Sequence, residues 1–586
     1  MTLFFHLPKT IVGLCAASLI ALTANTTRSD VAPIAPGLSP IGNYLAGRHA
    51  ESEHDLSIAA DFLKAVLDQS PNVPDLRRRT FVLLVMEGRI KEALPLAKGL
   101  YKERPNGSIT NLFLTTDEFK RKNFKAAAER LASLPNKGLS GLSAPILLAW
   151  ALTAEKKIAE ALVALKPLEK EKGARALHDL HKGLILDFSG RTADAQKIYE
   201  SLAIRESALS FRQTQLMGNL YERLGNIDAA TKLYDLYQKK NPDTSLLYVA
   251  RERLKSKVTP KPLITSATDG AAEIFFGIAN SLRRQRARET ALLLAQLALY
   301  LKSDYPIMRV LVGEILEMDA RYEDANFHYG TVSEMSPFKQ TAQMRIANNF
   351  HNMGRTDEAI VIAHAVAKAR PYDPEPVRAV GDYLRATERY KEAIPKYNEA
   401  IRRAGILKPS HWRLFYTRGI ALERMKKIKQ SEADFLKALE LQPDQPFVLN
   451  YLGYSWIEQG RHLNKAQDMI RKAVSLRPND GYIIDSLGWV YYQLGNYDDA
   501  VVELERAVQY RPEDPIINDH LGDAFWQVGR KKEARFQWLH SLSLKPSADV
   551  EKLVRDKLKN GLKPITNSFV KKELPAPKKG LPLLHD

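Results

Sequence analysis

The sequence predicts an all-α protein built from a long series of repeated helix pairs. Gly419, Gly453, Gly488 and Gly522 recur at a spacing of about 34 residues, within the range of roughly 20–50 residues that is typical of repeat architectures. An aromatic or aliphatic residue follows each glycine three places later, on the same helix face. A proline closes each unit, because it lacks the amide hydrogen that a helix interior requires. Several positions recur together, so chance repetition does not explain the pattern.

Each of these C-terminal units is predicted to contain two helices. Ser431, Ala466, Ala500 and Ala534 open the second helix in the same frame. Small side chains at these anchors let the helix backbones approach closely, and the larger residue nearby fills the remaining gap. Gly495 fits a left-handed turn between the two helices of one unit.

The same frame extends toward the N-terminus and gives about fourteen units. Clear earlier units are centred on Gly381, Ala347, Gly313, Ala279, Gly218 and Gly183, and weaker ones on Ala149, Thr116, Phe81 and Gly47. Between Pro242 and Ala271 the spacing rises from about 34 to about 61 residues. This interruption is either a loop that divides two arrays or one degenerate repeat.

The order of small, aromatic, alanine and proline positions resembles the tetratricopeptide repeat. The resemblance covers roughly residues 40–546 and is strongest from about residue 405 onward. It implies antiparallel helix pairs stacked into a right-handed superhelical solenoid with a concave groove. Thr116 stands where glycine or alanine is expected, and Arg418 stands where an aliphatic residue is usual, so those two units are expected to be distorted.

Six segments follow from this organisation. They are a signal peptide or N-terminal anchor (1–30), an N-terminal repeat array (31–242), an irregular linker or degenerate repeat (243–271), a C-terminal array (272–546), a capping helix (547–562) and a basic tail expected to be flexible (563–586). The capping helix is expected because the last repeat of a solenoid otherwise exposes its apolar side.

The start of the chain indicates export. Lys9 precedes an apolar run from Ile11 to Ala24, which is as long as a signal-peptide core and shorter than a typical membrane span. A retained anchor and lipidation of Cys15 are the alternatives, although Leu14 departs from a lipidation motif. We therefore expect a periplasmic or envelope-associated protein, with membrane anchoring left open.

Composition bounds the chemistry and the partners. The 586 residues are 45% hydrophobic and 26% charged, as in a folded soluble protein, and they contain one cysteine. The formal net charge of +18 is spread along the chain. Such a charge suits association with anionic membrane or peptidoglycan, whereas nucleic-acid binding is not expected.

The sequence contains no phosphate-binding GxxxxGK[ST], no GxSxG and no HExxH motif. His178 and His181 could share a helix face, but no carboxylate or cysteine set accompanies them, so no metal site is predicted. Asp498 and Asp499 stand at a predicted helix start, where acids are favoured by the helix dipole. We predict no catalytic residues, no cofactor and no enzyme activity.

The resemblance implies that partner proteins or peptides bind in the groove lined by the first helices. Trp489 immediately follows Gly488 and is expected to be exposed there; the alternative is that such rings pack inside the stack. Mixed aromatic and hydrogen-bonding residues are typical of interaction hot spots. The predicted groove residues are Arg413, Tyr416, Phe447, Asn450, Tyr454, Tyr482, Asp485, Trp489, Tyr492, Asp519, Asp523 and Trp526.

The whole-chain arrangement, including the DGAAE segment at Asp269–Glu273, resembles exported cell-envelope tetratricopeptide proteins of alphaproteobacteria. It is less similar to lipoprotein adaptors that present substrates to periplasmic proteases. The resemblance implies a non-catalytic scaffold or adaptor that supports envelope integrity or assembly. The alternatives are a membrane-tethered assembly factor and, from another class, an enzyme subunit with unrecognised hydrolytic activity.

Overall fold

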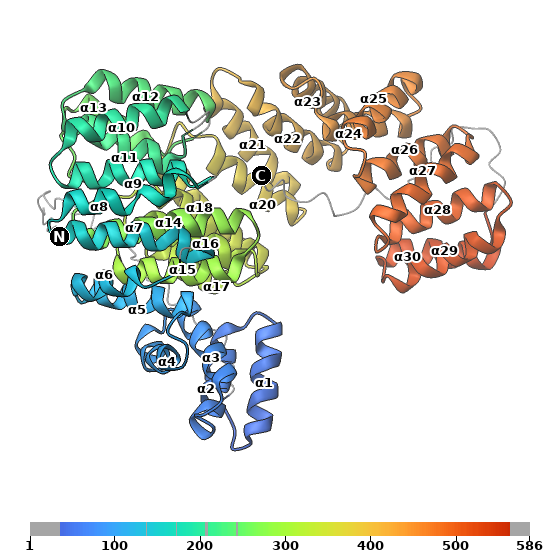
Figure 1. Cartoon of the computed structure of the whole chain (residues 1–586). Helices are drawn as coiled ribbons and strands as arrows, with labels where there is room; N and C mark the ends of the chain where they lie inside the picture. Colours follow the sequence, from blue (N-terminus) through green and yellow to red (C-terminus); the bar gives the residue numbers. More distant parts are fainter. Residues whose placement is uncertain (1–34, 136, 172, 206–208, 242–243, 563–586) are drawn as a thin grey trace, which may run out of the picture. The chain divides into compact units, whose positions relative to one another are not determined.

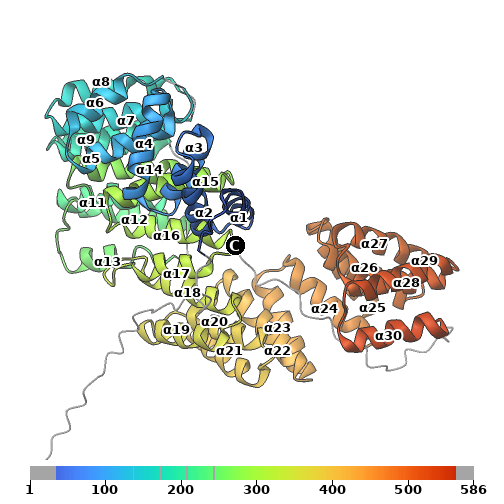
Figure 2. The same cartoon turned by 90° about the horizontal axis from the view of Figure 1, so that it is seen from below.

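The computed structural model describes residues 35–135, 137–171, 173–205, 209–241 and 244–562. In these residues it contains thirty α-helices, two short 3-10 helices and no strand, so the predicted all-α superhelical repeat array is confirmed (Figure 1, Figure 2). The predicted signal or anchor at 1–30, with Cys15, and the predicted tail at 563–586 lie outside the described residues. None of the described helices combines the length and the apolar character that crossing a membrane requires.

The chain divides into two compact units, Met1–Met353 and Gly354–Asp586. The helices of unit 1 are α1 Pro40–Ser52, α2 Leu56–Gln69, α3 Pro74–Met86, α4 Ile90–Glu103, α5 Ser108–Lys120, α6 Phe124–Ala132, α7 Gly138–Ala154, α8 Ile158–Ala164, η1 Lys166–Glu169, α9 Arg175–Phe188, α10 Thr192–Arg205, α11 Phe211–Arg223, α12 Ile227–Lys240, α13 Tyr248–Lys255, α14 Ala267–Arg284, α15 Arg288–Leu301, α16 Pro306–Glu317, α17 Tyr322–Gly330 and α18 Lys339–Asn352.

Unit 2 continues the same alternation of first and second helices. Its helices are α19 Thr356–Ala369, α20 Glu375–Ala386, α21 Tyr390–Ala404, η2 Pro409–His411, α22 Trp412–Arg424, α23 Ile428–Leu441, α24 Pro446–Glu458, α25 Leu463–Leu476, α26 Gly481–Gln493, α27 Tyr497–Tyr510, α28 Pro515–Gln527, α29 Lys531–Ser543 and α30 Ala548–Asn560.

The glycine anchors mark the points where two helices of a pair touch. An ideal Cβ built on Gly419 would lie 2.7 Å from the ring of Phe435, and one on Gly381 would lie 2.7 Å from Tyr397. A larger residue therefore does not fit at these positions without a shift of the partner ring. Gly495, between α26 and α27, has a φ of +83°, which confirms the predicted left-handed turn.

The stretch predicted as a linker or degenerate repeat contains α13 and an irregular segment that runs to the start of α14. The irregular segment is held to the array, because the side-chain amide of Asn219 on α11 donates to the carbonyl of Lys261 at 2.9 Å. After it, α14 packs against α5, α7 and α9, and α15 packs against α3 and α5. The chain of unit 1 thus folds back onto its own first helices.

Candidate interaction surface

The twelve predicted groove residues lie on the first helices α22, α24, α26 and α28 of unit 2, and we call this set the first-helix face of unit 2. The helices are neighbours, because α24 packs against α26 and α26 packs against α28. Tyr416 of α22 meets Tyr451 of α24 edge to face, with ring centroids 6.1 Å apart. The set is therefore continuous from α22 to α28.

The residues of this face differ in their access to solvent. Tyr416, Trp489, Tyr492, Asp519 and Asp523 are buried. Arg413, Phe447, Asn450, Tyr454, Tyr482, Asp485 and Trp526 are half-buried. The expectation that Trp489 is exposed is wrong, since its side chain is 5% exposed.

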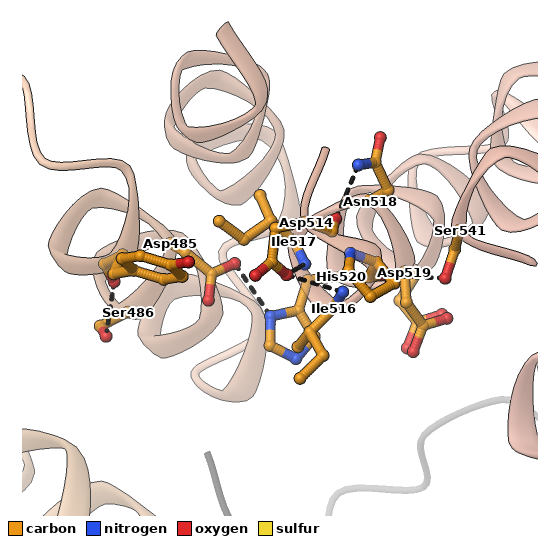
Figure 3. A network of polar contacts seen from close by, with 12 residues as sticks. Asp485, Ser486, Asp514, Ile516, Ile517, Asn518, Asp519, His520 and Ser541 are labelled. Atoms are coloured by element: carbon orange, nitrogen blue, oxygen red, sulfur yellow. Dashed lines mark hydrogen bonds and ion pairs between the residues drawn. The ribbon is translucent and has the colours of Figure 1, made fainter. Parts of the chain in front are cut away.

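Trp489 is buried because rings from two helices enclose it. It stacks on Tyr492 of the same helix with ring centroids 4.7 Å apart, and on His520 of α28 at 3.9 Å. The Nδ1 atom of His520 lies 2.9 Å from Oδ1 of Asp485 (Figure 3). Burial opposes the charged ring, yet the Asp485 carboxylate raises the pKa of His520 above its ordinary value. Trp489 and Asp485 therefore join α26 to α28.

A second polar cluster joins α28 to the cap helix α30. The Nζ atom of Lys557 lies 2.8 Å from each carboxylate oxygen of Asp519 and 2.7 Å from Oδ2 of Asp523. The indole of Trp538 donates to Oδ1 of Asp523 at 2.9 Å. Burial raises the pKa of Asp523 to about 6 even with the ammonium group beside it. Asp519 and Asp523 therefore form ion pairs within the chain, with Lys557.

The sequence prediction missed two carboxylates on the first helices, Glu423 of α22 and Glu458 of α24. The hydroxyl of Tyr451 donates to Oε2 of Glu423 at 2.8 Å. Burial, together with the carboxylates of Glu458, Asp485 and Glu423, raises the pKa of Tyr454 well above its ordinary value. Glu423 and Glu458 stand near the ends of their first helices, beyond the positions assigned to the groove, and that is why they were not singled out.

Other predicted groove residues contact parts of the same unit. The guanidinium of Arg477 lies over Phe447, 4.7 Å from its ring centroid, and that of Arg511 lies over Tyr482 at 5.1 Å. Such cation–π contacts cover part of each ring. The side-chain oxygen of Asn450, in contrast, is buried without a hydrogen-bond partner within the described residues. An unpaired buried acceptor is costly and marks a place for a ligand donor or water.

The corresponding first helices of unit 1 are covered by the chain itself. On α15, the amide of Gln296 donates to the carbonyl of Met86 at 3.1 Å, and the hydroxyl of Tyr300 donates to Asp117 at 3.0 Å. Met86 ends α3 and Asp117 lies on α5. The first helices α3, α5, α7 and α9, which we call the first-helix face of unit 1, are therefore already covered by α14 and α15.

A buried ion pair anchors this occupant. Arg212 of α11 donates to both oxygens of Glu273 of α14 at 2.9 and 2.7 Å, and the hydroxyl of Tyr305 donates to the same carboxylate at 2.7 Å. Glu273 is 2% exposed. Burial opposes ionisation, but the guanidinium keeps the pKa of Glu273 below its ordinary value. Both charges are paired, as burial requires.

The two neighbouring histidines do not form one site. His178 Nδ1 lies 2.7 Å from Asp179, and its Nε2 lies 3.3 Å from Glu169. His181 instead accepts a hydrogen bond from the indole of Trp150 at 3.0 Å. Across the described ranges, no group of three or more His, Cys, Asp or Glu side chains is placed to hold a metal ion.

Two segments of the chain match models of known protein families. Residues 378–446 match the family model described as "Tetratricopeptide repeat", and residues 488–529 match the one described as "TPR repeat". No curated protein sequence matches the chain.

Among solved structures, the chain is similar to the APC/C hetero-tetramer Cut9-Hcn1, with 15% identity, 90% of this chain and 97% of that chain covered, and a TM-score of 0.38. It is similar to yeast Tom70, with 13% identity, 89% and 95% covered, and a TM-score of 0.36. It is also similar to Naa15/Naa10 bound to HypK-THB, with 14% identity, 89% of each chain covered, and a TM-score of 0.35.

The family matches fall on helix pairs whose glycine contacts and turns have the repeat geometry described above. Repeats of this kind indicate a protein–protein interaction scaffold and are generally non-catalytic. Residues 378–446 and 488–529 of the chain therefore contain tetratricopeptide repeats.

Proposed function

We propose that this protein is an exported, non-catalytic scaffold of the bacterial cell envelope that holds partner proteins or peptides on the first-helix face of unit 2. The observation that carries the proposal is the difference between the two units. In unit 1 the equivalent face is covered by α14 and α15, whereas in unit 2 the described helices packed extensively on α22, α24 and α26 are their neighbours in the array.

The chemistry of the face supports partner binding. Half-buried Tyr454 stands one turn before Glu458 on α24, and the carboxylate of Glu458 reaches solvent. Aromatic residues supply large contact area at low entropic cost.

The envelope location rests on sequence features. They are the signal-like run from Ile11 to Ala24, the net charge of +18 and the resemblance to exported envelope proteins. A scaffold with this charge would associate readily with anionic membrane or peptidoglycan. Presentation of substrates to a periplasmic protease is one form that the scaffold role would take. The mass of the mature N-terminus separates a cleaved, exported protein from a tethered one.

The proposal is tested by capturing partners from a cell-envelope fraction with the tagged mature protein and with a Glu458→Arg variant. We expect the variant to lose the partner, because a charge reversal one turn from Tyr454, at the edge of the face, opposes whatever the carboxylate attracts. The matched control is Asp468→Arg, the same charge change on the exposed side of the second helix α25 in the same repeat. Circular dichroism checks that all three proteins are equally helical.

Equal capture by both variants and by the wild type would place binding away from this face. Loss from Asp468→Arg as well as from Glu458→Arg would indicate that net charge, and not the face, controls binding. Retention of peptidoglycan or lipid without any protein would assign the function to the basic surface.

A further inference from the structure

The cap helix α30 contacts the end of the first-helix face with little apolar surface. Its buried residues are Val550 and Val554. The first helix α28 beneath it buries eight residues. Leu558 and Leu562 are half-buried and pack against the same core, so the apolar contact of this segment consists of two buried and two half-buried side chains.

A lysine completes the contact. Lys557 Nζ touches Asp519 and Asp523 within 2.8 Å, and the two aspartates are 8% and 4% exposed. A buried ion pair adds little net stability, because removing the charges from water offsets their attraction. It does impose specificity, since a helix without a cation here would leave two buried carboxylates unpaired. The contact is therefore selective without being strong.

We propose that α30 is an internal competitor for a basic amphipathic helix of a partner, which binds at Asp519 and Asp523 when α30 is displaced. This inference rests on the proposed function, because it assigns a class of partner to the end of the same face. The residues of α30 define that class. Val550 and Val554 are one turn apart and Lys557 follows three residues later, so all three lie on one side of the helix. Helix-in-face recognition uses anchors at such spacings.

Charge excludes the opposite class of partner. An acidic helix would bring carboxylates toward Asp519 and Asp523, and like charges in a partly desolvated site repel strongly. The chain passes close to the first-helix face directly after α30. Gly561 lies so close to the ring of Trp526 that an ideal Cβ there would overlap it.

That close approach offers a way to release α30 without changing the aspartates. Gly561 also has a φ of +68°, which valine tolerates poorly, so a Gly561→Val substitution is expected to loosen the end of α30. Val554→Asp, which places a charge at a fully buried position of α30, is an independent release variant. Increased hydrogen exchange of the amides of α30 reports release directly.

The probe is a labelled peptide with the sequence of residues 547–562, titrated by fluorescence anisotropy onto the full chain. We expect each release variant to bind it at least about tenfold more tightly than the wild type, because α30 no longer competes. Adding Asp519→Asn and Asp523→Asn to a release variant should weaken binding by about tenfold. A peptide carrying Lys557→Glu should not bind. Asp468→Asn is the matched control and should leave binding unchanged.

The proposal is overturned if a variant with faster exchange in α30 binds the peptide no better than the wild type. It is also overturned if the Asp519→Asn, Asp523→Asn double substitution leaves the affinity unchanged. The proposed function is tested separately, by partner capture with the Glu458→Arg variant. If Glu458→Arg loses the partner but the release variants gain no peptide binding, the scaffold function stands and the proposal that α30 competes with a partner helix is rejected.

Discussion

The two units are built from the same kind of helix pair but use the first-helix face in different ways. In unit 1, Gln296, Tyr300 and Glu273 from α14 and α15 bond to first helices of the same unit. In unit 2, α30 is held through Lys557 at the end of the corresponding face. The repeat pattern therefore sets the packing of helix pairs, whereas the capacity for a partner depends on whether later segments fold back over the face.

This difference also predicts different unfolding behaviour. In a simple solenoid each repeat contacts its neighbours, so stability spreads along the array. Unit 1 departs from that rule, because the contact of Gln296 with Met86 and that of Tyr300 with Asp117 join distant repeats. We expect unit 1 to unfold as one cooperative block and unit 2 to loosen from its ends.

The largest effect is expected from breaking the buried ion pair of unit 1. Arg212→Ala leaves Glu273 charged and unpaired at 2% exposure, which should lower the free energy of unfolding of unit 1 by about 3–5 kcal/mol. Urea denaturation combined with hydrogen exchange localises the loss. Protection of α14 and of the first helices that it covers should fall together, while α22–α28 should keep theirs.

The control for that experiment is an exposed ion pair. Arg530 meets Glu533 at 2.8 Å and Glu505 at 3.2 Å, and 43%, 50% and 45% of these three side chains are exposed. Arg530→Ala should cost less than about 1 kcal/mol. A comparable loss for both substitutions would mean that α14 does not lock unit 1.

The second largest effect is expected from acidification, which should change the stability of the two units in different directions. Burial lowers the pKa of His181 in unit 1 from 6.5 to about 4. The unfolded chain therefore binds a proton below pH 6.5 that the folded unit accepts only near pH 4, so stability falls as the pH drops through this window. The loss is on the order of 3 kcal/mol by pH 4. His328, whose pKa burial lowers to about 3, adds to the trend.

His520 in unit 2 has the opposite sign. Its pKa is raised, so its pairing with Asp485 is fully present below the unfolded pKa and is lost as the pH rises through the folded value. Denaturation curves at pH 7 and pH 4.5, followed by hydrogen exchange of each unit, measure the contrast. His181→Gln should flatten the pH dependence of unit 1 and leave that of unit 2 intact. An unchanged slope would exclude His181 as the cause.

Much of the fold was predictable from local spacing. Gly419 is one of the recurring glycine anchors and Gly495 is a predicted turn residue, and the structure confirms a helix contact at the first and a left-handed turn at the second. The return of α14 over α7 was not predictable, because it pairs distant residues without a periodic signature. The interrupted spacing before Ala271 marked where the change occurs but not where the following helices would pack.

The glycine-to-ring contact between paired helices should contribute similarly to the stability of both units. Gly313→Ala in unit 1 and Gly419→Ala in unit 2 each place a Cβ against the ring of a paired helix, Tyr329 and Phe435 respectively. Each should cost about 1–3 kcal/mol, since overpacking forces the ring to shift. Thermal unfolding of the two variants gives the comparison. A large cost in one unit alone would show that the helix pairs of the two units are not equivalent.

The candidate surface was less predictable than the fold. Position within a repeat indicated which residues face the neighbouring first helix, but not whether a side chain from that helix covers them. Trp489 is buried because His520 of the next first helix lies on its ring, and His520 stands at a position that the repeat pattern does not single out. Glu458 was missed because it stands at the end of α24, beyond the positions that the repeat pattern assigns to the groove. Its raised pKa depends on partial burial and on Glu423 of α22, which only the fold brings near it.

The smallest effect on stability, and the most informative for function, is expected from Glu458→Gln. Partial removal from water, and then the neighbouring carboxylate of Glu423, raise the pKa of Glu458 to about 7. The folded unit therefore binds this proton more tightly than the unfolded chain, and stability falls as the pH rises from 4.5 to about 7. Glutamine does not ionise, so the variant should melt above the wild type at pH 8 and together with it at pH 5. The difference at pH 8 should be small, because Glu458 is exposed and solvent screens its interactions. Partner capture should nevertheless fall, because the carboxylate that destabilises unit 2 is the one that we expect a partner to neutralise. Loss of both stability and capture would assign Glu458 a structural role, and an unchanged capture would remove it from the surface.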